Sequence, residues 1–176
     1  MFIKSSQEQI DMASVLIVAE LDLPNYVIDT VSSAFRGLVG VELKKADLSE
    51  VKARSFDARR GQIRADKALS LLPRPRGRDR AVYVVVGDGY VPGLNFVFGV
   101  AQGNIAVVFT ERLAAERELF YERIAKEIIH ELGHTFGLGH CGDPRCVMYF
   151  SNTVHDTDLK GPGFCDKCFL RLRLRR

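Results

Sequence analysis

The chain has 176 residues, a formal net charge of +3 at pH 7, and 47% hydrophobic against 27% charged residues. This length suits a single domain with a buried core, and so small a net charge does not by itself indicate a nucleic-acid or membrane partner. No apolar run is long enough to span a membrane and the first residues lack the pattern of a secretory signal, so we expect a cytoplasmic protein whose cysteines stay reduced.

The first half of the chain alternates between strand and helix patterns. In chain order, these patterns predict a strand, a helix, a second strand and a second helix over residues 14–23, 24–37, 39–48 and 56–72. Pro24 in the first turn and Gly37 at the C-terminal end delimit the first helix. The second helix contains Gly61 and ends at the loop formed by residues 73–80.

Three further strands and a long helix complete the periodic part of the sequence. We predict them over residues 81–91, 95–101, 104–110 and 111–134. Strands that alternate with helices and then give way to a pair of short strands indicate an α/β (α+β) fold with a mixed sheet.

The composition changes after Gly137. Residues 138–168 are rich in glycine, aspartate, proline and cysteine and have little periodicity. A loop-rich segment of this length needs something other than a hydrophobic core to hold it, and a bound metal would serve. We therefore expect one domain over residues 1–176, divided into an N-terminal subdomain, 1–137, and a C-terminal subdomain, 138–176.

Two segments of the chain are strongly basic. The loop "RPRGRDR" carries four arginines, and the chain ends in "RLRLRR". Neither segment has the interleaved aromatic residues that stack on bases, so we interpret both as solvent-exposed and expect no nucleic-acid partner. We also expect a monomer.

Residues 128–150, "IIHELGHTFGLGHCGDPRCVMYF", contain three histidines, one glutamate and two cysteines. His130 and His134 are four residues apart on the predicted helix, so both imidazoles lie on one face and can share a metal ion. Gly137 can adopt the left-handed conformation that ends the helix in a sharp turn and returns His140 to the same metal. A lone histidine is usually a surface or core residue, but this spaced set indicates a shared zinc ion.

Three imidazole ligands leave one tetrahedral position open, which is typical of a catalytic zinc. Zinc lowers the pKa of bound water from about 15.7 towards about 7 and polarises a carbonyl group. Glu131 lies beside His130, where it can take a proton from that water as general base and pass it to a leaving amine. The predicted reaction is hydrolysis of an amide, with a peptide bond as the expected substrate.

All four cysteines lie after residue 140, as Cys141-x4-Cys146 and Cys165-x2-Cys168. In a reducing compartment this clustering indicates metal, whereas the alternative of two local disulfides would require export. Four thiolates complete a tetrahedral shell, so this would be a second, structural zinc. Neighbouring side chains in an extended segment point in opposite directions, so His140 and Cys141 can face different metals. A mixed site, in which Cys141 replaces His140, is the alternative.

The spacing of the histidines, the glutamate and the following glycine resembles the signature of the metzincin metalloproteases, His-Glu-x-x-His-x-x-Gly-x-x-His, here residues 130–140. Its continuation through the four cysteines and Met148 resembles the archaemetzincins, small proteins found in archaea and vertebrates. The resemblance implies a metzincin-like zincin fold, with a mixed twisted sheet, an active-site helix and a loop-rich C-terminal part that zinc staples together.

The resemblance also implies the role of each site residue. It assigns the catalytic zinc to His130, His134 and His140, the general base to Glu131, and a structural zinc to Cys141, Cys146, Cys165 and Cys168, so two zinc ions are expected per chain. Met148 becomes the methionine of the Met-turn beneath the histidines, whereas without the family it is an apolar loop residue. Metzincins bind an extended peptide along a sheet edge by strand addition, and residues 95–101 are the best candidate for that edge.

One position departs from a pattern found in part of the family. Some metzincins carry a tyrosine two residues after this methionine that can reach the zinc. Here that position is Phe150, preceded by Tyr149, so we assign no tyrosine ligand. We interpret His155 as a surface histidine, with a place in the cleft as the alternative.

Two functions follow from these patterns. The first is a cytoplasmic zinc metallopeptidase of the archaemetzincin type that acts on peptides or small proteins. The second is a zinc-stabilised binding protein whose peptidase-like site is weak or idle and whose basic segments mark a partner surface. A site kept only for structure does not need Glu131 beside its open metal, which favours the first. We set aside a deformylase-like hydrolase, because those enzymes take a cysteine ligand from upstream of the helix and every cysteine here lies downstream.

Overall fold

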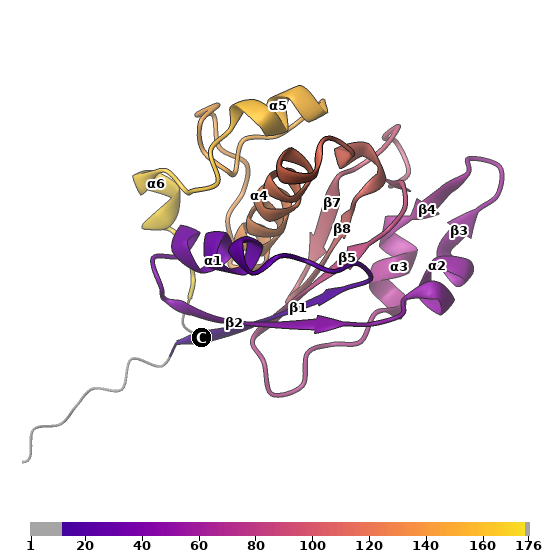
Figure 1. Ribbon diagram of the computed structural model, residues 1–176, viewed down its shortest axis with the longest axis horizontal. Coiled ribbons are helices and arrows are strands. Elements are labelled where there is room, and N and C mark those ends of the chain that lie inside the picture. Colours follow the sequence, from indigo (N-terminus) through magenta and orange to yellow (C-terminus); the bar gives the residue numbers. More distant parts are fainter. Residues whose placement is uncertain (1–11, 175–176) are drawn as a thin grey trace, which may run out of the picture.

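The computed structural model describes residues 12–174, in which a five-stranded sheet is covered by helices on both faces (Figure 1). The strand order is β2-β1-β5-β8-β7. The strands are β1 (Ala13–Ala19), β2 (Val39–Lys45), β5 (Arg80–Val85), β7 (Gly99–Gln102) and β8 (Ile105–Phe109). Four strands run parallel, and β7, at the edge, runs antiparallel to β8. The predicted mixed sheet is therefore confirmed.

The sheet has a hydrophobic core on each face. Helices α1 (Asn25–Ala34) and α4 (Arg117–Thr135) pack on one face, and α3 (Ala65–Leu71), with α2 (Ser49–Ser55) beside it, packs on the other. Parallel strands that are covered on both faces have nearly continuous apolar sequences. Strand β8, with the sequence IAVVF, is buried at every position for this reason.

The second predicted helix is much shorter than its pattern. Residues 56–64 instead form the strands β3 (Phe56–Asp57) and β4 (Gln62–Arg64), and the helix begins only at Ala65. The turn between the strands closes when the N–H of Gly61 donates to the carbonyl oxygen of Asp57 at 2.8 Å, with Gly61 at a φ of 67°. A glycine in this left-handed conformation cannot continue a helix, so the prediction over 56–72 is wrong in its first half.

Two further elements are divided where the patterns predict continuity. Strand β4 pairs with the short strand β6 (Gly89–Tyr90), so the predicted strand over 81–91 is split between two sheets. The predicted helix over 111–134 is split into a 3-10 turn, η1 (Glu111–Leu113), and α4. Helix α2 lies where the pattern predicts none.

The segment after α4 is mostly loop, as its composition predicts. It contains two short helices, α5 (Val154–Leu159) and α6 (Asp166–Phe169), which Figure 1 shows above α4 and beside α1. An ion pair between Arg36, in the turn after α1, and Asp166 of α6 joins these two regions at 2.9 Å. Among residues 12–174, no helix has the length and apolar character needed to cross a membrane.

Candidate active site

Helix α4 carries the first two histidines and the glutamate of the motif. His130 and Glu131 are buried in its last turns, and His134 follows one turn later. Gly137 lies just after the helix at a φ of 90°, and its N–H donates to the carbonyl oxygen of His134 at 3.0 Å. This left-handed glycine turns the chain back sharply, as the spacing predicts, and brings His140 next to the other two histidines.

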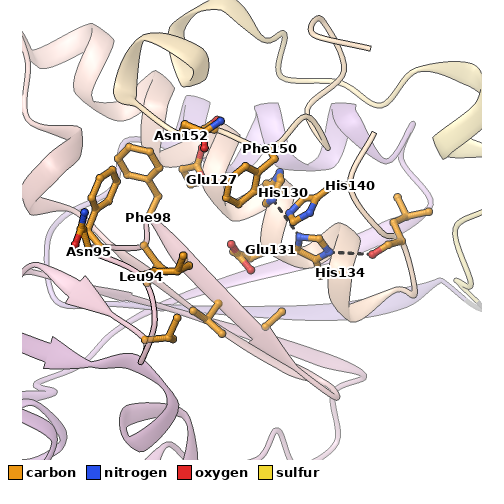
Figure 2. Close-up of a pocket in the computed structure, with 18 residues that line it drawn as sticks. Leu94, Asn95, Phe98, Glu127, His130, Glu131, His134, His140, Phe150 and Asn152 are labelled. Carbon is orange, nitrogen blue, oxygen red and sulfur yellow. Dashed lines mark hydrogen bonds between the residues drawn. The ribbon is translucent and has the colours of Figure 1, made fainter. Parts of the chain in front are cut away.

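The three histidine side chains converge on one point (Figure 2). One potential ligand atom from each ring lies within 4.8 Å of the other two. The ring centroid of His134 is 4.7 Å from that of His130 and 4.8 Å from that of His140. Because His130 is buried and His140 is exposed, the point where the three rings converge is enclosed by protein on the His130 side and open to solvent on the His140 side.

The hydrogen bonds of the rings identify which nitrogen faces this point. The Nδ1 atoms of His130 and His134 lie 2.8 and 2.9 Å from the carbonyl oxygens of Val147 and Leu138. A carbonyl oxygen only accepts, so each Nδ1 carries the proton and each Nε2 presents a lone pair. The two Nε2 atoms are 3.1 Å apart, and facing lone pairs repel unless a cation lies between them. Two nitrogens bound tetrahedrally to zinc at about 2.0 Å would lie about 3.3 Å apart, so this donor set fits zinc.

Burial keeps these imidazoles in the form that binds metal. It lowers the pKa of His130 well below the usual value and lowers the pKa of His134 and His140 in the same direction. Metal binds the neutral imidazole, not the imidazolium. The site is therefore ready for a cation at neutral pH without first having to lose protons.

The carboxylate of Glu131 lies beside the histidines in a cleft of about 590 Å³ (Figure 2). Its Oε2 atom is buried and has no hydrogen-bond partner within residues 12–174. Burial raises the pKa of Glu131 well above its usual value, with the negative charge of Glu127 adding to the rise and Lys160 opposing it. A buried carboxylate oxygen without a partner is rare and calls for an explanation, and a buried group with a strongly shifted pKa inside a cleft is a candidate functional residue.

Two ion pairs attach helix α5 and the residue after it to helix α4. Glu127 lines the cleft, and its Oε1 lies 2.9 Å from the Nζ of Lys160 and accepts the Thr157 hydroxyl at 3.1 Å. Among residues 12–174 the Nζ of Lys160 has no well-aligned hydrogen-bond acceptor, so its contact with Glu127 is mainly Coulombic. Arg123 donates to both carboxylate oxygens of Asp158 at 2.7 and 2.8 Å. These contacts hold the C-terminal segment against the active-site helix.

Replacing Lys160 by methionine is expected to lower the free energy of unfolding by about 3–5 kcal/mol, because the Glu127 charge would stay buried without its partner. Both side chains are almost fully buried, so neither can turn to solvent. Urea unfolding measures the effect. The matched control is the double variant Lys160→Met with Glu127→Gln, which removes both charges and should recover much of the loss. A single variant as stable as the wild type would show that the pair contributes nothing.

The four cysteines form a second group beside the histidines. Their Sγ atoms all lie within 4.8 Å of one another, and those of Cys141 and Cys165 are 3.8 Å apart. Sulfurs bound tetrahedrally to zinc at about 2.3 Å lie about 3.8 Å apart, whereas a disulfide needs about 2.0 Å. All four cysteines are free, so the group fits a metal and not two disulfides. His140 and Cys141 are adjacent in the chain yet belong to different groups.

The remaining predicted residues lie around the histidines. Met148 is completely buried, and a Cβ atom at Gly133 would lie 2.4 Å from its sulfur. Its side chain therefore packs directly against α4, where the family resemblance expects the floor of the site. The Phe150 ring lies 4.8 Å from that of His140 and lines the cleft. His155 is exposed on α5 and is not part of the cleft lining.

The sequence analysis gave no individual role to several residues that line the cleft, among them Glu127 and Gly99. Glu127 is four residues before Glu131, so the helical period alone places both on one face and could have revealed it. Gly99 also lines the cleft, but a single glycine in an apolar strand carries no local signal that would point to a site.

Comparison with known proteins gives one consistent family. Peptidase family M54 matches residues 78–174. The archaemetzincin of Pyrobaculum aerophilum is 51% identical over 129 residues, which cover 72% of this chain and 79% of that protein.

Solved structures agree with the sequence relatives. The crystal structure of the archaemetzincin of Methanopyrus kandleri matches with a TM-score of 0.79 and 40% identity, covering 90% of this chain and 92% of that chain. A structure described as a zinc-dependent peptidase from Methanocorpusculum labreanum matches with a TM-score of 0.76 and 28% identity, covering 89% of this chain and 98% of that chain. The similarity thus extends over nearly the whole fold.

Proposed function

The chain belongs to peptidase family M54, the archaemetzincins, and is a zinc metallopeptidase; from this premise we propose that its three clustered histidines hold the catalytic zinc and that Glu131 is the general base. The observation that supports this most directly is that the Nε2 atoms of His130 and His134 face each other 3.1 Å apart, in a cleft that Glu131 also lines. The substrate of a peptidase is a peptide, and the cleft beside the histidines is the place for its scissile bond.

His130, His134 and His140 would hold the zinc ion, which would supply a Lewis acid that polarises a carbonyl oxygen and makes a water molecule more acidic. The Nδ1–H groups of His130 and His134 donate to main-chain carbonyls, which holds both rings in the tautomer that presents Nε2. The carboxylate of Glu131 accepts a proton from the attacking water as the new C–O bond forms. It then delivers this proton to the amide nitrogen as the C–N bond breaks.

Strand β7 is the edge along which we propose that the peptide binds. The carbonyl oxygen of Phe98 accepts the N–H of Phe109 from the end of β8 at 2.8 Å. Main-chain groups alternate in direction along a strand, so Gly99 and Ala101 turn their N–H and C=O groups away from β8. These groups can pair with an extended peptide by strand addition. The residues just before β7 line the cleft as well.

We propose that the four cysteines hold a second, structural zinc, which gives two zinc ions per chain. Four sulfur ligands leave no open position for substrate. The cysteines join the loop that follows His140 to helix α6, across a segment that has only two short helices. On this proposal the chain divides near residue 137 into a sheet-containing part and a C-terminal part held together by zinc.

Replacing His134 by alanine is expected to lower the zinc content from two ions per chain to one and to abolish peptide hydrolysis. Two imidazoles bind zinc far more weakly than three, while the cysteine group is left intact. Elemental analysis combined with cleavage of a peptide library measures both effects. His155→Ala, which alters an exposed histidine outside the cleft, is the matched control and should keep both properties. A His134→Ala protein with two zinc ions and normal cleavage would refute the proposed site.

A further inference from the structure

Gly99 opens strand β7, beside the cleft. Its φ is not among the positive values found in this chain, so the backbone at this position could accept any residue. Glycine inside a strand weakens it, and it often marks a place where another group approaches closely. The reason for this glycine must therefore be sought in what lies against it.

The group that approaches is the carboxylate of Glu131. A Cβ atom built on Gly99 would lie 2.6 Å from both the Cγ and the Oε1 of Glu131 and 2.8 Å from its Cδ. Carbon atoms in contact lie about 3.5–4.0 Å apart, so even the smallest side chain at this position would overlap the carboxylate. The carboxylate thus occupies the space that a side chain would fill.

The direction of the strand explains this contact. Ala101, two residues on and on the same face of β7, packs against the core that contains α4, whereas Val100 packs against the core on the opposite face. Gly99 therefore faces α4. Glu131 is only 4% exposed, so its side chain cannot move into solvent to make room.

We propose that Gly99 is the positioning residue of the general base, because its missing side chain lets the strand itself hold the carboxylate of Glu131 in place. One carboxylate oxygen, Oε1, lies against the strand, and the other, Oε2, is buried without a hydrogen-bond partner among residues 12–174. Gly99 also turns its main-chain N–H and C=O groups towards the proposed path of the peptide. This proposal rests on the proposed role of Glu131 as general base and adds that Gly99 positions its carboxylate.

The test is Gly99→Ala in the zinc-loaded full chain. We expect kcat to fall by roughly 10²-fold, since a displacement of about 1 Å at a reacting group costs this much, while KM and the zinc content stay close to the wild-type values. The matched control is Gly40→Ala in strand β2, where the new Cβ would meet only Met12 at an ordinary 3.7 Å. This control should keep the wild-type kcat.

A second readout does not depend on activity. Gly99→Ala should lower the urea midpoint of the wild-type chain, but it should leave the midpoint unchanged in a Glu131→Ala background, where the overlapping carboxylate is gone. Equal midpoint shifts in both backgrounds, or a Gly99→Ala enzyme with wild-type kcat, would overturn the proposal. If the wild-type chain with two zinc ions cleaves no peptide, the proposed function fails. The shifts in urea midpoint caused by Gly99→Ala in the wild-type and Glu131→Ala backgrounds still show whether Gly99 makes room for the carboxylate of Glu131.

Discussion

Glu131→Gln is expected to lower kcat for peptide hydrolysis by roughly 10²- to 10⁴-fold and to leave the zinc content unchanged. Glutamine has nearly the shape of glutamate but cannot accept a proton at the same position. Glu131 is not among the groups that converge with the histidines as potential ligands, so zinc should stay bound. The variant therefore separates proton transfer from metal binding.

Within the described part of the chain, no neighbouring carboxylate is placed to replace Glu131. Glu127 is the other acidic residue that lines the cleft, and one of its oxygens is engaged by Lys160 and Thr157. Steady-state kinetics and elemental analysis on the same preparations measure the outcome. Glu118→Gln, at an exposed position of the same helix, serves as the matched control. Wild-type kcat in Glu131→Gln would remove this residue from proton transfer.

Cys168→Ser is expected to release the zinc of the cysteine group and to unfold much of the segment after α4. Zinc bound by such a group stabilises small domains by about 10–16 kcal/mol at neutral pH, which is more than the ion pairs between this segment and α4 supply. The His140 site should weaken too, because His140 is bonded directly to Cys141, whose N–H donates to the carbonyl oxygen of Met148 at 2.9 Å. Zinc content should therefore fall below one ion per chain.

Limited proteolysis measures the expected unfolding of the segment after α4 in Cys168→Ser. Cleavage should become rapid within residues 138–174 while the sheet and α4 stay resistant. Arg145→Ala alters an exposed side chain in the same loop, so it should leave both zinc content and proteolysis as in the wild type. A Cys168→Ser chain that retains two zinc ions and resists protease would mean that the cysteines are not a structural metal site.

Most strands could be predicted because their signal is local. Residues 14–23 and 104–110 are largely apolar, residues 39–43 are mostly apolar as well, and the structure has a strand in each of these regions. The error over 56–72 arose because a helical pattern continued through Gly61, whose backbone turns the chain instead. The partner that stabilises this alternative is β6, far along the chain, and no short window of sequence contains it.

The sequence by itself determined the convergence of His130, His134 and His140, because helical period and a left-handed glycine set their relative positions over a few residues. It also indicated the clustered cysteines, whose spacing is local within each pair. Only the tertiary structure decided that Gly99 makes room for Glu131 and that Lys160 reaches Glu127. Each of these contacts joins residues far apart in the chain, so it depends on how the sheet, α4 and the C-terminal segment pack and not on any local pattern.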